Sequence, residues 1–193
     1  MRLGFNEAND RFCQGHTVMQ DLELCEKYGF DCIDIQSECL NRDLEKGIVT
    51  IEELGAWFAT HHLKMLSYNA LCFFNMKQTA EEKQAVMDEL DEIIRRCNIL
   101  GCKMIVVVPS QDMKARGLQP TRKEIREDAV AVLKEMVKKV EPHGIKLSLE
   151  FCGEPAMTIN RFEDAYAIVE AVGSPMVGVT LDQYHFYAMG SGW

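Results

Sequence analysis

The sequence predicts an α/β fold in which parallel strands alternate with helices, arranged as an incomplete (β/α) barrel. An amphipathic helix, a short turn and a run of apolar and β-branched residues recur along the chain. Strands that alternate with helices of this length imply right-handed crossovers and a parallel sheet covered by helices. Polar side chains also stand at the ends of the expected strands, where barrel enzymes keep their active sites.

The expected elements follow one another regularly from the N-terminus. Six strands are predicted near residues 2–6, 31–36, 63–69, 103–109, 145–151 and 176–182, with five helices between them. In LELCEKYGFDCIDI and IIRRCNILGCKMIVVV, Gly29 and Gly101 stand where a helix ends, because glycine tolerates the left-handed backbone of that position. The segments MVKKVEPHGIKLSLE and AYAIVEAVGSPMVGVTLD repeat this transition, and LGAWFATHHLKMLSYN makes it without a glycine. A closed barrel needs eight such units, so we predict a single partial TIM-barrel domain over residues 1–193.

The loop after the first expected strand favours a barrel over an open doubly wound sheet. A dinucleotide-binding sheet carries GxGxxG at this point, whereas FNEANDRFCQG has no such pattern, and the P-loop signature is also missing. Polar residues at strand ends are instead expected to converge on one rim of a barrel, namely Asn6, Glu7, Gln36, Asn69, Glu150 and Asp182.

Composition narrows the classes of function. The formal net charge of −9 disfavours a nucleic-acid partner, because phosphate contacts need clustered Lys and Arg. No apolar run is long enough to span a membrane, so we expect a cytoplasmic protein. The eight cysteines lack CxxC spacing, which predicts that most of them are reduced core residues rather than members of disulfides or of a zinc–cysteine site. They are Cys13, Cys25, Cys32, Cys39, Cys72, Cys97, Cys102 and Cys152.

Two carboxylates end neighbouring strands of the predicted sheet. Glu150 is the last residue of the otherwise apolar strand in KLSLEFCGEP, and Asp182 holds the same place in GVTLDQYHF one βα unit later. Two acids at adjacent strand ends repel each other unless a cation lies between them. A divalent metal site is therefore one interpretation. The other is that each carboxylate caps the following helix or pairs with Lys or Arg.

Further polar and aromatic side chains are candidates for substrate contacts. His185 follows Asp182 by three residues and either projects into the same mouth or packs in its loop. Asn69 either binds a polyol hydroxyl or satisfies its own loop, and Asn6 and Gln36 offer similar amide groups. Aromatic residues of the same loops either wall a pocket or pack: Phe73, Phe74, Tyr184, Phe186 and Tyr187. His61 and His62 end a helix, which places them at the opposite face of a barrel.

Several stretches resemble a known family. GFNEA, DLELCEKYGFDCIDI, THHLK, NALCFFN, LEFCGEP and LDQYHFYAMGS are similar to the inosose (2-keto-myo-inositol) isomerases of the xylose-isomerase-like TIM-barrel superfamily. The resemblance runs from about Met1 to Ser191 and includes the loops. It implies a reaction on a small-molecule sugar or cyclitol, in which the carbonyl of an α-hydroxyketone moves to the neighbouring carbon through an enediol-like intermediate.

The resemblance also implies roles for individual residues. In the superfamily a divalent ion, zinc, manganese or magnesium, is held by Glu, Asp, His and Glu from successive strand ends. Glu150 matches the first glutamate and Asp182 the aspartate, and the glutamates of such a site also move the proton, so Glu150 is implied to be catalytic. His185 matches a histidine that contacts a substrate oxygen in related epimerases. Asn69 and Asn6 supply neutral hydrogen-bonding groups for a polyol.

The chain departs from the family after Asp182, where only residues 183–193 follow. The family continues through two more βα units, which carry the other metal-binding His and the second catalytic Glu. We therefore expect weak or absent metal binding, no activity for this chain alone, and self-association through exposed sheet edges. A non-catalytic remnant or assembly subunit, or another sugar epimerase or dehydratase, are the alternatives. The DNA-repair nuclease branch is disfavoured by the negative charge and by Asn69 and Pro109, which stand where histidines are expected.

Overall fold

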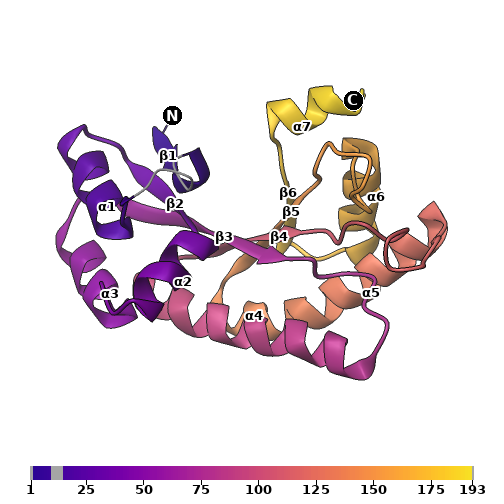
Figure 1. Cartoon of the computed structure of the whole chain (residues 1–193), viewed down its shortest axis with the longest axis horizontal. Coiled ribbons are helices and arrows are strands. Elements are labelled where there is room, and N and C mark those ends of the chain that lie inside the picture. Colours follow the sequence, from indigo (N-terminus) through magenta and orange to yellow (C-terminus); the bar gives the residue numbers. More distant parts are fainter. Residues whose placement is uncertain (1, 10–14, 193) are drawn as a thin grey trace. The chain divides into compact units, whose positions relative to one another are not determined.

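The computed structural model describes residues 2–9 and 15–192, and in this part of the chain a helix follows every strand (Figure 1). The predicted core residue Cys13 lies outside the described residues. In chain order the elements are β1 (Gly4–Asn6), η1 (Glu7–Asn9), α1 (Val18–Lys27), β2 (Cys32–Gln36), α2 (Ser37–Glu45), α3 (Ile51–Thr60), β3 (Lys64–Cys72), α4 (Ala80–Leu100), β4 (Met104–Val108), α5 (Arg122–Val140), η2 (Glu141–His143), β5 (Lys146–Glu150), α6 (Phe162–Val172), β6 (Val177–Thr180) and α7 (Gln183–Ala188).

The six predicted strands are confirmed, and their order in the sheet is β1-β2-β3-β4-β5-β6. Parallel pairing aligns Phe5 of β1 with Ile33 of β2, and Leu149 of β5 with Val179 of β6. Two strands end more than one residue away from the predicted position. β3 continues to Cys72, so Asn69 lies within the strand, and β6 ends at Thr180, so Asp182 lies beyond it.

The prediction of five helices between the strands was wrong, because two helices separate β2 from β3. The additional helix, α2, begins directly after β2. Its first turn is capped by Gln36, whose side-chain oxygen accepts hydrogen bonds from the backbone N–H groups of Glu38 and Cys39. Gln36 therefore serves as a helix cap, a role that its place in the sequence did not predict.

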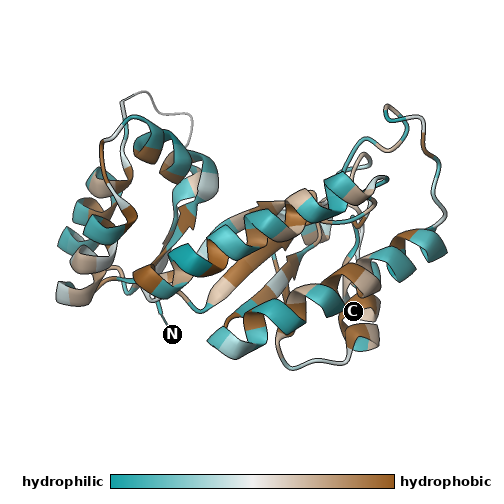
Figure 2. Cartoon of the chain, turned by 90° about the horizontal axis from the view of Figure 1, so that it is seen from below, coloured by the Kyte–Doolittle hydropathy of each residue, from teal (hydrophilic) through white to brown (hydrophobic). Residues whose placement is uncertain are grey.

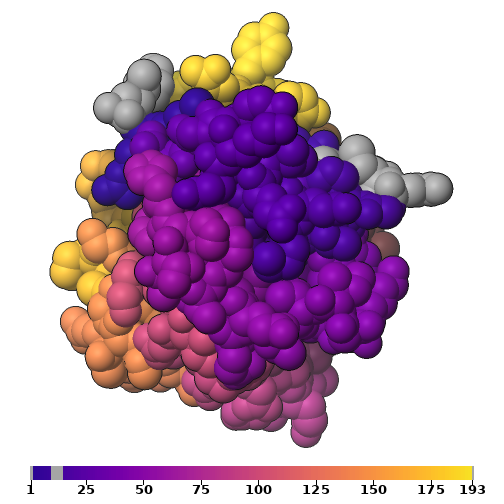
Figure 3. Space-filling view, turned by 90° about the vertical axis from the view of Figure 1, so that its left-hand side faces the viewer, coloured from indigo at the N-terminus to yellow at the C-terminus, as the bar shows by residue number. Residues whose placement is uncertain are grey.

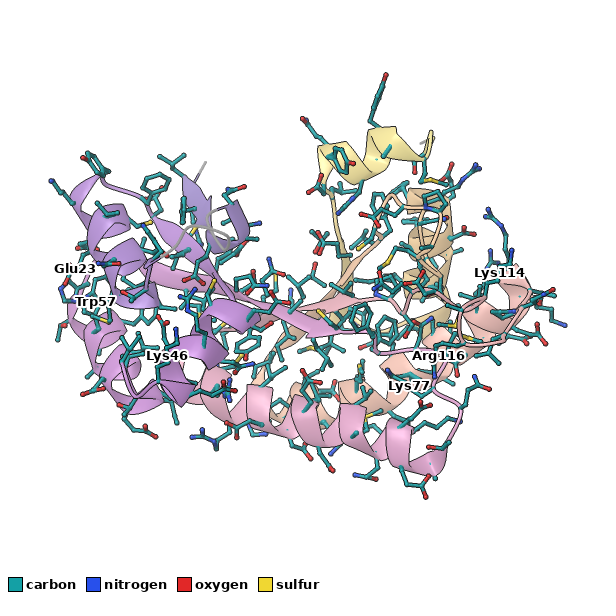
Figure 4. All side chains as sticks on the ribbon, viewed as in Figure 1. Glu23, Lys46, Trp57, Lys77, Lys114 and Arg116 are labelled. Carbon is teal, nitrogen blue, oxygen red and sulfur yellow. The ribbon has the colours of Figure 1, made fainter. Side chains whose placement is uncertain are left out.

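The chain divides into two compact units, of which unit 1 comprises Met1–Ala70 and Glu92–Ile105. Its core consists of apolar side chains from strands and helices that are fully buried, such as Leu22, Ile33 and Leu54. Helix α3 begins with a capping box at Thr50 and ends at His61, whose ring stacks on Trp57 with 3.9 Å between the ring centroids. Figure 3 shows the outer face of the N-terminal part of the chain, and Trp57 is labelled in Figure 4.

Unit 2 comprises Leu71–Asp91 and Val106–Trp193. Its core joins β5 to the helices that cover it, with Leu133 of α5, Leu149 of β5 and Ile168 of α6 all at most 1% exposed. Figure 2 shows hydrophobic and hydrophilic residues alternating around the helices, as expected where one helix face packs on a sheet. In the β4–α5 loop, Arg116, labelled in Figure 4, donates to the carboxylate of Glu82 at 3.0 Å.

The prediction that most of the cysteines are core residues is confirmed for five of those that the structure describes. Cys25, Cys32, Cys39, Cys97 and Cys102 are buried, whereas Cys152 is half-buried and Cys72 is exposed. In the described part of the chain, every helix is too short or too polar to cross a membrane.

The carboxylate of Glu92, in unit 1, is expected to make the folded protein less stable at low pH. Its carboxylate accepts hydrogen bonds from Arg95 and from Arg96 at 2.8 Å, and these contacts, Arg95 foremost, lower the pKa of Glu92 to about 2. Because the folded pKa is depressed, the stabilisation is fully present above the unfolded value of 4.5 and is lost as the pH falls from there through about 2. The contribution is small because the side chain is 42% exposed. The thermal unfolding midpoint of the unsubstituted chain should fall as the pH drops from 4.5 to about 2. We expect a smaller fall for Glu92→Gln, measured by thermal unfolding at these pH values.

Candidate metal centre

Glu150 stands at the carboxyl end of β5. The strand KLSLE buries Leu147, Ser148 and Leu149, as expected for a parallel strand covered on both faces, and Glu150 is its half-buried last residue. Its backbone pairs with Thr180 at the end of β6. The prediction that Glu150 ends a strand is confirmed, and the register places it beside the segment that leads from β6 into α7.

Asp182 follows β6 by two residues and begins α7. Its Oδ1 accepts hydrogen bonds from the backbone N–H groups of Tyr184 at 2.7 Å and of His185 at 3.2 Å. Asp182 is therefore the N-cap of α7, which is one of the two roles that its sequence position left open. Both hydrogen bonds go to Oδ1 of the carboxylate, and these bonds orient the side chain.

His185 lies one helical turn into α7, close to both carboxylates. Ligand atoms of Glu150, Asp182 and His185 all lie within 4.8 Å of one another, and the three side chains are half-buried. Within residues 2–9 and 15–192, Nδ1 of His185 is enclosed and has no hydrogen-bond partner. Figure 1 shows α7 following β6 directly, which explains how residues 182 and 185 come to the same place.

The three side chains fit a divalent cation. Two carboxylates and an imidazole form a donor set that suits zinc, and three protein ligands leave a coordination position for another group. A cation also relieves the repulsion between the carboxylates and supplies a partner for the enclosed imidazole nitrogen. The interpretation of Glu150 and Asp182 as members of one site therefore agrees with their geometry, and His185 joins them.

Cys152 lies beside this cluster. Burial foremost, together with the nearby acidic groups of Glu150, Cys72, Glu154 and Asp182, raises the pKa of its thiol to about 12. The thiol is therefore neutral at pH 7, and it adds an uncharged, polarizable side chain to the surroundings of the carboxylates.

The two roles of Asp182 can be separated by substitution. Asp182→Ser keeps a side-chain oxygen for the N–H groups of α7 but removes the charge, whereas Asp182→Ala removes both. We expect Asp182→Ser to keep the unfolding free energy close to that of the unsubstituted chain, and Asp182→Ala to lower it by about 1 kcal/mol. Both substitutions should weaken zinc binding. Thermal unfolding and zinc titration measure the two effects, and equal stability of the two variants would contradict the capping role.

Two of the predicted substrate contacts lie in unit 1. Asn6 ends β1, is exposed, and accepts a hydrogen bond on Oδ1 from the backbone N–H of Ala8 at 2.9 Å. Asn69 is half-buried within β3 and aligns with Gln36 of β2. Their roles in binding substrate stay predictions.

The aromatic side chains of the unit 2 loops have different environments. Phe74 is 1% exposed and belongs to the core, while Tyr184 and Tyr187 of α7 are 68% and 87% exposed. Phe186, also in α7, packs against other aromatic rings: its ring centroid lies 5.7 Å from that of Phe162 and 6.4 Å from that of Phe151. Phe74 and Phe186 therefore pack against other residues, which is the simpler of the two roles expected for them.

Sequence reasoning missed Asn75, whose side chain connects three neighbouring loops. This residue is fully buried, and its Oδ1 accepts a hydrogen bond from the N–H of Ser110 at 2.7 Å. Its Nδ2 donates to Oγ1 of Thr158 at 3.2 Å. Asn75 thus joins the loops that follow β3, β4 and β5. The sequence holds only a weak signal for this role, an asparagine inside the apolar stretch LCFFNM.

Known proteins similar to this chain include several inosose isomerases. The inosose isomerase of Bacillus velezensis is 38% identical over 191 residues, which cover 99% of this chain and 65% of that protein. That of Bacillus subtilis is 38% identical over 191 residues, which cover 99% of this chain and 66% of that protein. The chain therefore spans about two thirds of the length of these relatives.

A solved structure shows the same fold. The crystal structure of the IolI protein with a bound zinc atom matches with a TM-score of 0.91 and 38% sequence identity, over 100% of this chain and 66% of that one. The family model of the xylose isomerase-like TIM barrel matches residues 22–192. With six strands in chain order, helices between them and relatives of this identity, the chain belongs to the xylose isomerase-like TIM barrel family.

Proposed function

We propose that this chain carries the first part of the active site of a metal-dependent cyclitol isomerase, which acts on an α-hydroxyketone such as 2-keto-myo-inositol. The observation that carries the proposal is the convergence of ligand atoms from Glu150, Asp182 and His185 within 4.8 Å at the carboxyl ends of β5 and β6. The inosose isomerases at 38% identity support the choice of substrate class.

We assign Glu150 and Asp182 as ligands of a divalent cation and infer that the cation is zinc. The donor set of carboxylates and imidazole supports zinc, and the related IolI protein has a bound zinc atom. The chemistry that such a cation supplies is polarisation of the ketone oxygen and the adjacent hydroxyl of the substrate. Asp182 keeps its orientation because the N–H groups of α7 hold one of its oxygens.

Glu150 also moves the proton in this proposal. Its carboxylate accepts the proton from the carbon that bears the hydroxyl group and returns it to the carbon that was the ketone. The proton of the hydroxyl group moves to the former ketone oxygen, so the carbonyl ends on the neighbouring carbon with no net gain or loss of atoms. Glu150 suits this task because it is half-buried and is the last residue of β5. The rigid strand fixes the position from which its side chain extends.

The proposal is tested by restoring the length of the relatives. The purified chain is mixed with a polypeptide that covers the remaining third of the Bacillus velezensis inosose isomerase, with zinc present, and conversion of 2-keto-myo-inositol is followed. We expect turnover in the mixture and little or none with either part alone. Metal analysis of the mixture should find zinc bound. A mixture that assembles and binds zinc but converts no α-hydroxyketone would contradict the proposed isomerase activity.

A further inference from the structure

Phe73, the first residue after β3, combines two features that are each unfavourable for stability. Its backbone has a φ of 59°, in the left-handed region where a bulky side chain is crowded by its own backbone. Its aromatic side chain is also 39% exposed, although burial would remove this apolar surface from water. Residues held in such strained conformations cluster at functional sites. Phe73 is therefore a candidate for a role in function rather than in stability.

The three residues that follow fix this conformation. Phe74 is 1% exposed, and its N–H donates to the backbone of the last residue of β4 at 3.3 Å. Asn75 is fully buried and hydrogen-bonds to the loops after β4 and β5. The N–H of Met76, whose φ is 58°, donates to Oδ2 of Asp128 at 2.6 Å. These contacts offset the strain, so Phe73 is held in one backbone conformation.

Phe73 stands on the same rim of unit 2 as Glu150. The carboxyl ends of β3, β4 and β5 all belong to unit 2, with β4 between the other two. Neighbouring strands lie about 4.8 Å apart, so the ends of β3 and β5 lie about 10 Å apart across the sheet. The thiol of Cys72, which precedes Phe73, interacts electrostatically with that of Cys152 in the loop after β5. One six-membered ring with its hydroxyl groups spans a distance of this size.

The faces of the proposed substrate are apolar. In 2-keto-myo-inositol every hydroxyl group is equatorial, so the hydroxyl groups point outward around the ring and the C–H bonds stand on its two faces. A phenyl ring attracts such C–H groups by dispersion and through the negative charge of its own face. An exposed phenyl ring therefore suits the face of this substrate, whereas carboxylates and amides suit its edge.

We propose that Phe73 is a platform on which one face of the cyclitol ring packs, so that the ketone and its neighbouring hydroxyl are directed toward Glu150 and Asp182. The inference rests on the proposed function and adds a preference to it. Rings whose hydroxyl groups are all equatorial fit the platform, because an axial hydroxyl group would stand against the phenyl face. The strained loop between β3 and α4 holds the platform in place.

The test uses the chain assembled with the complementing polypeptide and zinc, and scyllo-inositol as the probe. All hydroxyl groups of this cyclitol are equatorial, and it has no ketone that could react. Calorimetric titration measures its dissociation constant. We expect Phe73→Ala to weaken binding about tenfold, because the contact with the phenyl face is lost, and Phe73→Tyr to bind like the unsubstituted protein. With 2-keto-myo-inositol, Phe73→Ala should raise KM by a similar factor and leave kcat within about twofold.

Met76→Gly is the matched control for the strain of the loop. Met76 has the same left-handed conformation, so glycine relieves strain at this position while the phenyl ring stays. We expect Met76→Gly to keep its affinity for scyllo-inositol. Phe73→Gly should unfold at a higher temperature than Phe73→Ala, because glycine tolerates the left-handed backbone, and yet bind the probe as weakly as Phe73→Ala does. Thermal unfolding also checks that all variants fold.

Four results would overturn the inference. They are unchanged affinity in Phe73→Ala, equal weakening in Phe73→Ala and Met76→Gly, binding by Phe73→Tyr that is as weak as that of Phe73→Ala, and no binding of scyllo-inositol by the unsubstituted protein. The last of these would remove the platform even if the ketone were converted.

The same experiments distinguish this inference from the proposed function. Binding of scyllo-inositol that depends on Phe73, without turnover of 2-keto-myo-inositol, would remove the isomerase function and leave the platform. Turnover with a KM that is insensitive to Phe73→Ala would remove the platform and leave the function.

Discussion

Glu150→Gln is expected to abolish isomerase turnover in the complemented protein, with a loss of about 1,000-fold or more. Glutamine has nearly the shape of glutamate but carries no negative charge and accepts no proton at neutral pH. The substitution therefore removes both the base and one of the anionic cation ligands, while β5 and its register with β6 are retained. The measurement is the initial rate with 2-keto-myo-inositol, combined with zinc analysis of the purified protein.

Glu154 offers a matched control for this prediction. It lies four residues further along the same loop, is exposed, and is not a member of the metal cluster. Glu154→Gln removes the same charge from the same neighbourhood, and we expect turnover within about twofold of the unsubstituted protein, because exposed charges far from the reacting atoms have weak effects. Normal turnover in Glu150→Gln would disprove the assignment of Glu150, and an equal loss in both variants would point to a general charge effect.

Asn75→Ala is expected to lower the free energy of unfolding by about 2–3 kcal/mol. The substitution leaves the N–H of Ser110, a residue that is 2% exposed, without the acceptor that it has in Oδ1 of Asn75. It also removes the amide that contacts Thr158. Burial of an unpaired donor has a larger effect than the average hydrogen bond contributes, because the group has lost its water without a replacement. Denaturant unfolding of the chain measures the change.

Asn160→Ala is the control for the Asn75→Ala substitution. Asn160 is half-buried and donates one hydrogen bond from Nδ2 to the carbonyl oxygen of Glu154 in an exposed setting, so water replaces the lost amide. We expect this substitution to change the unfolding free energy by less than about 1 kcal/mol. If the two asparagine variants were equally stable, the network of Asn75, Ser110 and Thr158 would have no special part in holding the loops together.

The sequence predicted the strands of this protein better than their ends. Glu150 was placed correctly at the end of β5, because KLSLE is a short apolar run with one polar terminus. Asp182 was placed at the end of a strand but caps α7, since an acidic residue after an apolar run suits a strand end and a helix N-cap equally well. Helix α2 was missed because SECLNRDLE has few apolar residues, and its cap lies on the preceding strand at Gln36.

The sequence by itself determined the alternation of helices and parallel strands and the two carboxylates that end neighbouring units, because both are written in patterns a few residues long. Only the tertiary structure decided that His185 stands beside those carboxylates and that Asn75 joins three loops. The hydrogen bonds of Asn75 alone connect residues that are 35 and 83 positions apart in the chain. Such relations depend on how packed strands and helices bring distant backbone segments together, and no local pattern of residues encodes that proximity.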